Sequence, residues 1–131
     1  MQTLEMPKKT VVDCNTWCRG VFVGFDGSGS ALLTKNKTRC CLGFACSQAG
    51  ITDTFLFRCA SPGGLNVHVT RLIEQPGKEN SDNSMWTTNA MNINDDEAIT
   101  DKERMRQLTA YWKKLGEGYS VEFINVPEQE E

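Results

Sequence analysis

The segment Cys40–Cys46 constrains the fold of this chain more than any other. It reads Cys-Cys-Leu-Gly-Phe-Ala-Cys behind Arg39, in a chain whose hydrophobic share is only 39%, and it holds three of the six cysteines. An apolar run of this kind is stable only when it is packed away from water. We expect a buried helix over Cys41–Ala49 that ends at Gly50, since glycine accepts the left-handed conformation that closes a helix.

Length and charge limit the classes of protein to consider. A chain of 131 residues has the size of one domain. Its net charge of −3 argues against nucleic acid as a partner, because such binding needs a basic face. No run of about 20 apolar residues is present, so we expect no membrane span. Residues Met1–Lys9 lack the apolar stretch of a signal peptide, which predicts a cytoplasmic location and reduced thiols.

The first two thirds of the chain predict short elements separated by turns. Residues 1–10 have the polar composition of a disordered start, and Val11–Arg19 is compatible with a short helix. Val21–Phe25 and the stretch 31–34 read as two strands around a glycine-rich turn. Leu65–Leu72 alternates apolar and polar residues, as a half-buried strand does. The polar stretch 75–84 contains Pro-Gly and predicts a mobile loop.

The last third carries the clearest local signals. Thr100 and Glu103 have the spacing of a capping box, which marks the start of a helix over Asp101–Leu115. Tyr119–Phe123 alternates as a final strand, and an acidic tail follows at 127–131. We therefore expect a single α+β domain over residues 11–126, in which a small antiparallel sheet packs against two main helices.

Several landmarks fall in an order that is similar to one protein family. They are Trp17–Gly20, Ser30–Leu33, Cys40–Phe44, Asn94-Asp95, Arg104 and Val121–Phe123. On these residues the chain resembles a family of small proteins encoded by bacteriophages and prophages, for which no catalytic residues are assigned. The hydrophobic stretch 21–25 departs from the pattern. The resemblance implies a phage accessory protein in an infected bacterium, one that binds and neutralises a host protein or a small nucleotide signal without catalysis.

A glycine-rich loop is the first candidate binding site. It consists of Gly27, Ser28, Gly29 and Ser30. Such a loop can present amides and hydroxyls to a phosphate, with Arg19 and Arg39 as charge partners. It lacks the lysine of a P-loop. A simple hairpin turn between two strands explains the same residues.

Two further candidates lie in the second half of the chain. Asn94 and Asp95 have side chains that can bind a nucleobase edge, a ribose or a divalent ion, and they also suit an ordinary lead-in to a helix. Trp86 stands beside the polar stretch 75–84, and we expect it to be partly exposed at a binding edge. Its ordinary interpretation is a packed core residue.

The cysteines and charged residues leave two alternative functions open. Structural zinc sites combine two close ligand pairs, and here only Cys14 and Cys18 form an ordinary pair, so we expect buried thiols, with no metal site and no cofactor. A zinc-stabilised interaction module remains one alternative. The other is a nucleotide-directed enzyme that uses Arg19, Arg39 and Asp95 or Asp96. We assign no catalytic residue, and the sequence does not fix the oligomeric state.

Overall fold

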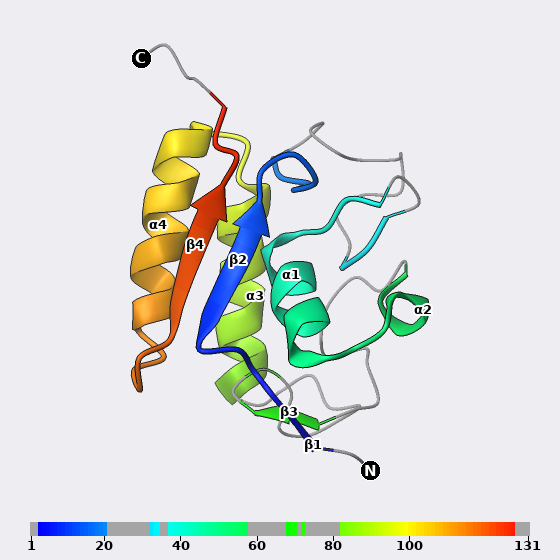
Figure 1. Cartoon of the computed structure of the whole chain (residues 1–131). Coiled ribbons are helices and arrows are strands. Elements are labelled where there is room, and N and C mark those ends of the chain that lie inside the picture. The colour runs from blue at the N-terminus through cyan, green and yellow to red at the C-terminus, as the bar shows by residue number, and fades with distance from the viewer. Residues whose placement is uncertain are drawn as a thin grey trace.

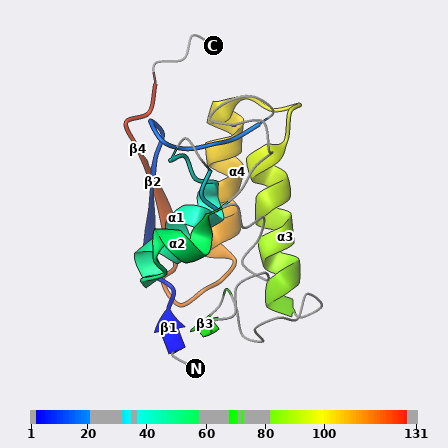
Figure 2. The ribbon, with the colours of Figure 1, turned by 90° about the vertical axis from the view of Figure 1, so that its right-hand side faces the viewer.

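The fold is a layer of helices against a two-stranded sheet. The computed structural model describes residues 3–20, 32–34, 37–57, 68–70, 72 and 82–127. The elements in chain order are β1 (Thr3–Glu5), β2 (Lys9–Asp13), α1 (Cys41–Ala49), α2 (Asp53–Leu56), β3 (His68–Thr70), α3 (Asp82–Asp95), α4 (Asp101–Lys113) and β4 (Ser120–Ile124). Figures 1 and 2 show α3 and α4 behind the β2–β4 sheet and α1 beside β2. The predicted α+β class is confirmed.

Both strand pairs are parallel, so the predicted antiparallel sheet is wrong. β2 pairs with β4 in register from Lys9 with Ser120 to Asp13 with Ile124, and β1 pairs with β3. Parallel neighbours need a long crossover connection, whereas the sequence-based prediction assumed hairpins between consecutive strands. Here the crossover between β2 and β4 contains the four helices of the described residues. The strands that pair are therefore distant in sequence.

The N-terminal region forms strands where we predicted disorder and a helix. β1 and β2 occupy parts of residues 3–13, so the expectation of a disordered start is wrong for this range, and Val11–Arg19 is not a helix. Within β2 the side chains of Thr10 and Val12 are fully buried. β-branched side chains in this alternation suit a strand with one covered face. Asp13 is the last residue of this strand.

The two helices with clear local signals lie where the sequence predicts them. α1 ends in a Schellman turn: Gly50 has φ 112°, its N–H donates to Ser47 (3.1 Å), and the Ile51 N–H donates to Cys46 (3.1 Å). α4 begins after Thr100, whose Oγ1 accepts the Glu103 amide (3.1 Å). These hydrogen bonds join residues close in sequence, and they fix the end of α1 and the start of α4 independently of distant parts of the chain.

Helix α3 has no counterpart in the sequence-based prediction. It begins at Asp82, so the last residues of the predicted 75–84 loop are helical. It also contains Asn94 and Asp95, which we expected to lead into the following helix and which instead end this one. Residues 75–81 lie outside the described part of the chain. The helix carries few apolar residues in a regular stripe, which explains why periodicity did not reveal it.

Other predicted elements are described in part. Of the predicted strand over Leu65–Leu72, the structure describes 68–70, which form β3, and Leu72. The short helix α2 corresponds to no predicted element. Of the predicted strand at 31–34, the structure describes Leu32, Leu33 and Thr34, and Leu33 forms an isolated parallel bridge with Phe57. The predicted strand at 21–25, the turn at 26–29 and the tail residues 128–131 lie outside the described residues.

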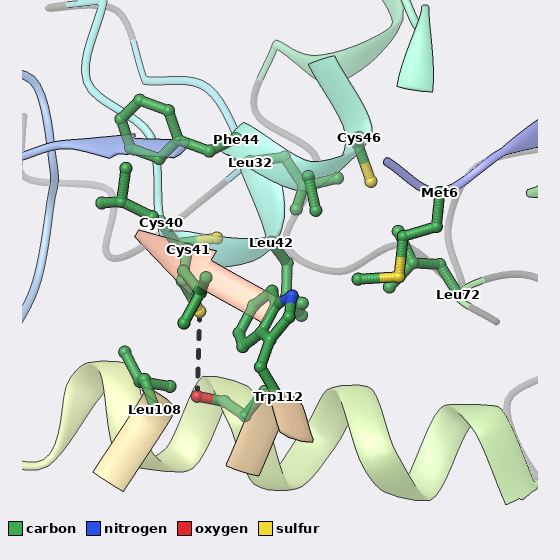
Figure 3. Close-up of a cluster of buried hydrophobic side chains, with 14 of the residues drawn as sticks. Met6, Leu32, Cys40, Cys41, Leu42, Phe44, Cys46, Leu72, Leu108 and Trp112 are labelled. Carbon is green, nitrogen blue, oxygen red and sulfur yellow. Dashed lines mark hydrogen bonds between the residues drawn. The ribbon is translucent and has the colours of Figure 1, made fainter. Parts of the chain in front are cut away.

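The cysteine-rich helix packs at the centre of the core, as its composition predicts. Residues 41–46 are all buried, and Figure 3 shows the side chains of Cys41 and Leu42 on the side of α1 toward Leu108 and Trp112 of α4. Gly43 is required by this packing, because an added Cβ would lie 2.1 Å from the carbonyl oxygen of Leu32 and 3.0 Å from the Cβ of Arg39. Only a residue without a side chain allows the 32–34 segment to approach α1 this closely.

This close approach predicts that Gly43→Ala destabilises the protein by about 3 kcal/mol, the upper part of the range for overpacked cores. Urea unfolding followed by circular dichroism measures the loss. Gly116→Ala is the control: no atom lies within 4 Å of its Cβ position, and its φ of +70° alone predicts a loss of about 1 kcal/mol. Equal losses in the two variants would contradict the packing explanation.

Candidate functional site

The candidate residue Asn94 is buried at the centre of a hydrogen-bond network. Its Oδ1 accepts from the indole Nε1 of Trp17 (2.7 Å) and from the backbone N–H of Cys41 (3.0 Å). Its Nδ2 donates to the carbonyl of Cys18 (3.0 Å) and to Asp95 Oδ1 (2.9 Å). All four hydrogen-bonding positions of the amide are thus used inside the protein. Asn94 joins α3 to the N-terminus of α1 and to the segment after β2.

Arg19, the second candidate, is engaged in the same region. Its side chain is only 8% exposed, and its Nε donates to Asp101 at the start of α4 (2.9 Å). Nη1 donates to the carbonyls of Trp17 (2.8 Å) and Cys14 (3.3 Å), and the guanidinium lies 4.8 Å from the Trp17 ring centroid. An anion that bound Arg19 would have to displace the Asp101 carboxylate.

A second buried arginine completes this region. Arg104 donates to Asp101, to the carbonyl of Asp96 and to the carbonyl of Ile99 (3.4 Å for the last). Its guanidinium lies against Gly20, where an added Cβ would be 3.4 Å from Nη2. The Asp101 carboxylate therefore forms ion pairs with both Arg19 and Arg104. We call the set Trp17, Arg19, Asn94, Asp101 and Arg104 the polar junction.

The Arg39 side chain binds outside the polar junction, although the Arg39 backbone forms a parallel bridge with Trp17. Its Nη2 donates to Asp53 at the start of α2 (2.7 Å), and its side chain is 18% exposed. Its backbone pairs with the segment after β2, where the Cys18 N–H donates to the Arg39 carbonyl (2.8 Å). The guanidinium groups of Arg19 and Arg39 thus bind carboxylates on different helices. A phosphate site that combines these arginines with the glycine-rich loop stays a prediction, because the loop residues 27–30 lie outside the described part of the chain.

The remaining sequence-based candidates divide into two groups. Gly27, Ser28, Gly29 and Ser30 lie outside the described residues. Trp86 is partly buried on α3, stacked on Tyr111 at 5.2 Å and edge-on to Trp112 at 5.0 Å. Its partial exposure is confirmed, and its position as a bridge between α3 and α4 gives it a packing role.

The thiols of α1 are protected rather than reactive. Burial raises the pKa of Cys40 from 9.0 to about 12 and also raises the pKa of Cys41 well above its ordinary value. Figure 3 shows the Cys41 thiol directed at the carbonyl of Ala90, 4.0 Å away. Thiolates are the nucleophilic and metal-binding form of cysteine, so these side chains act as core residues. The described residues contain no group of three or more His, Cys, Asp or Glu that could hold a metal ion.

Sequence reasoning missed two surface features. Phe55 and Phe57 flank the buried Leu56 and are 70% and 46% exposed. In addition, the Gln48 side chain bonds both main-chain groups of Val11, accepting its N–H (2.9 Å) and donating to its carbonyl (2.7 Å). The run Phe-Leu-Phe after a polar turn is a signal for the first feature. No local sequence pattern indicates the contact between Gln48 and Val11.

Comparison with known proteins gives no family assignment. No protein-family model matches the chain, and no curated protein or solved structure matches it either. None of the helices described here is long and apolar enough to cross a membrane. The functional argument therefore depends on the residues and contacts described above.

The network around Asn94 predicts a large effect of its removal. Asn94→Ala leaves the Trp17 indole, the Cys41 amide and the Cys18 carbonyl buried without their partner, so we expect a loss of about 3 kcal/mol in unfolding free energy. Asn92→Ala, at an exposed position of the same helix, is the matched control and should change stability by less than about 0.5 kcal/mol. Similar losses in urea unfolding for both variants would contradict a central role of Asn94.

The raised thiol pKa values predict alkaline destabilisation. The unfolded chain releases the Cys40 proton above pH 9, whereas the folded chain holds it to about pH 12. This contribution to stability is therefore complete below pH 9 and is lost as the pH rises toward 12. Urea midpoints measured from pH 7 to pH 11 should fall, and they should fall less steeply in Cys40→Ala.

The burial of the two thiols also predicts their accessibility to reagents. Iodoacetamide should label Cys40 and Cys41 only after denaturant is added. Rapid labelling in the native state would contradict their burial.

Proposed function

We propose that this chain is a phage accessory protein that binds a host protein in the cytoplasm of an infected bacterium and blocks its action, without catalysing a reaction. The observation that carries the proposal is the exposure of Phe55 on α2 and of Phe57 directly after this helix. Aromatic side chains are enriched where proteins bind one another. The resemblance of the cysteine-rich segment and its neighbours to phage proteins supplies the biological setting.

The two aromatic side chains stand on a fixed support. Helix α2 is anchored by the fully buried Leu56, and its first residue, Asp53, is bound by Arg39. The Phe55 amide donates to Thr52 (3.1 Å) and the Phe57 amide donates to Asp53 (3.0 Å). The rings are thus presented by an ordered backbone. A partner that covers them gains apolar burial without first having to order this segment.

The same contacts favour a protein partner over a small nucleotide. A nucleotide site needs cationic groups that a phosphate can reach, and Arg19 is buried and bound to Asp101. Arg39 is bound to Asp53, and Asp95 accepts from Asn94. The nucleotide-directed enzyme of the sequence analysis would use these same side chains, which here hold elements of the fold together.

The test is capture from host lysate followed by measurement with the purified partner. The chain should retain a specific bacterial protein, and Phe55→Ser/Phe57→Ser should bind that protein about 100-fold more weakly, equivalent to ~2.7 kcal/mol. The exposed positions predict little change in the stability of the variant. Lys113→Ser, on the exposed face of α4, is the control and should bind as the unmodified chain does.

A parallel screen separates this proposal from its alternatives. Calorimetry with nucleoside mono-, di- and triphosphates and cyclic dinucleotides should give no heat of binding, and incubation should leave them intact. Nucleotide binding that Arg39→Ala abolishes, together with an empty protein capture, would refute the proposal in favour of a nucleotide-directed function. Partner affinity unchanged by the double serine substitution would move the interface away from α2.

A further inference from the structure

The two outer edges of the β2–β4 sheet differ in how their main-chain hydrogen-bonding groups are satisfied. Hydrogen bonds at both ends of the ladder fix which main-chain groups face inward: the Ser120 N–H donates to Lys8 (2.8 Å), and the Cys14 N–H donates to Ile124 (3.0 Å). In a parallel ladder such bonds involve alternate residues of each strand. The intervening residues of β2 and β4 direct their N–H and C=O groups to the two outer edges.

The edge of β2 is closed by a side chain. Its outward-directed residue is Val11, and the Gln48 amide satisfies both main-chain groups of Val11, at 2.9 and 2.7 Å. Gln48 belongs to α1, which lies beside β2 in Figure 1. Here the amide of Gln48 takes the place that a neighbouring strand would occupy.

The edge of β4 has no such closure among the described residues. Val121 and Phe123 direct their main-chain groups outward, and β2 is the one strand that pairs with β4 in the described part of the chain. Proteins usually protect such an edge with proline, lysine or a covering segment, because it can accept another strand. β4 contains neither proline nor lysine, and the adjoining Ile124 and Val126 are 39% and 48% exposed.

Charge indicates which kind of strand would fit. The one charged side chain of β4 is Glu122, on the solvent-exposed face of the sheet, where Lys9 lies 2.8 Å away. The sequence then continues into Glu128, Glu130 and Glu131. A second copy of this chain paired along β4 would bring its own Glu122 to the same edge, whereas a basic segment meets opposite charge.

We propose that the outer edge of β4 binds an extended segment of another protein as an added strand, with a lysine or arginine facing Glu122 and apolar side chains facing Val121 and Phe123. The main-chain groups of Val121 and Phe123 supply the hydrogen bonds, and side chains of the two faces supply the selectivity. This surface is separate from the aromatic pair: Figure 1 shows α2 and β4 on opposite sides of the molecule.

The probe is a capped nine-residue peptide of alternating threonine and valine with lysine as its central residue. Titration into isotopically labelled protein should shift the amide resonances of residues 120–124 and leave those of α2 unchanged. The same peptide with a central glutamate should bind at least tenfold more weakly. Methylating the main-chain nitrogens of one alternate set of peptide residues should abolish binding, while methylating the other set should preserve it, because only one set faces β4.

A charge exchange supplies the matched variant. Lys9→Glu/Glu122→Lys keeps the ion pair and the net charge but places the cation on β4, so it should prefer the glutamate peptide. Both side chains are largely exposed, so stability should change little. The proposal would be overturned if the unmodified protein and the charge-exchange variant each bound the lysine and glutamate peptides equally well. It would also be overturned if both N-methylated peptides bound as well as the unmethylated one. Concentration-dependent dimerisation that shifts the β4 resonances without peptide would overturn it as well, since a second copy would then occupy the edge.

This test is independent of the host-protein proposal. Phe55→Ser/Phe57→Ser should leave peptide binding at β4 intact, because these side chains lie on α2. Loss of peptide binding in the charge-exchange variant with host capture retained would support two separate surfaces. Failure of the peptide titration, with host capture still dependent on Phe55 and Phe57, would refute only the β4 site.

Discussion

The amide of Asn94 is the interaction on which the arrangement of the elements depends. It ties α3 to the first amide of α1 and to the segment that follows β2, and it does so from a position with no solvent exposure. A buried amide is stabilising only when its donors and acceptors are all satisfied, so the neighbouring backbone must hold one geometry. The ion pairs of Asp101 with Arg19 and Arg104 fix the start of α4 in the same region. Polar residues here determine how the elements are placed, while the apolar core supplies the bulk of the burial.

This use of polar residues explains how a cluster that resembles a binding site in the sequence can serve to join elements of the fold. Arginine, asparagine and aspartate in a cluster are typical of ligand sites, and the same groups serve equally well to join helices when they are buried together. The sequence marks Asn94 and Arg19 as candidate ligand-binding residues, whereas the structure places both in buried contacts with protein groups, and burial depends on the whole fold. The exposed aromatic residues of α2 show the converse: Leu56 is buried while Phe55 and Phe57 are not. Hydrophobicity alone does not distinguish these three.

The elements that sequence reasoning predicted are those with a complete local signal. α1 and α4 are bounded by Gly50 and Thr100, whose effects reach only a few residues. α3 was missed because its burial is concentrated at positions such as Ala90 and Asn94, and its helical state depends on what it packs against. The direction of the strand pairs was also missed. Residues 9–13 and 120–124 form one ladder across nearly the whole chain, and no short-range pattern encodes such a pairing.

The parallel ladder between β2 and β4 has a mechanical consequence. The chain enters the ladder at the start of β2 and leaves it at the end of β4, so these two points lie at opposite ends of the sheet (Figure 1). A force that pulls them apart acts along the strands and loads all the hydrogen bonds of the ladder together, in shear. Strands in a hairpin would instead open one bond at a time. A cellular machine that pulls on the C-terminus while the chain before β2 is held therefore meets the resistance of the whole ladder before β4 can detach.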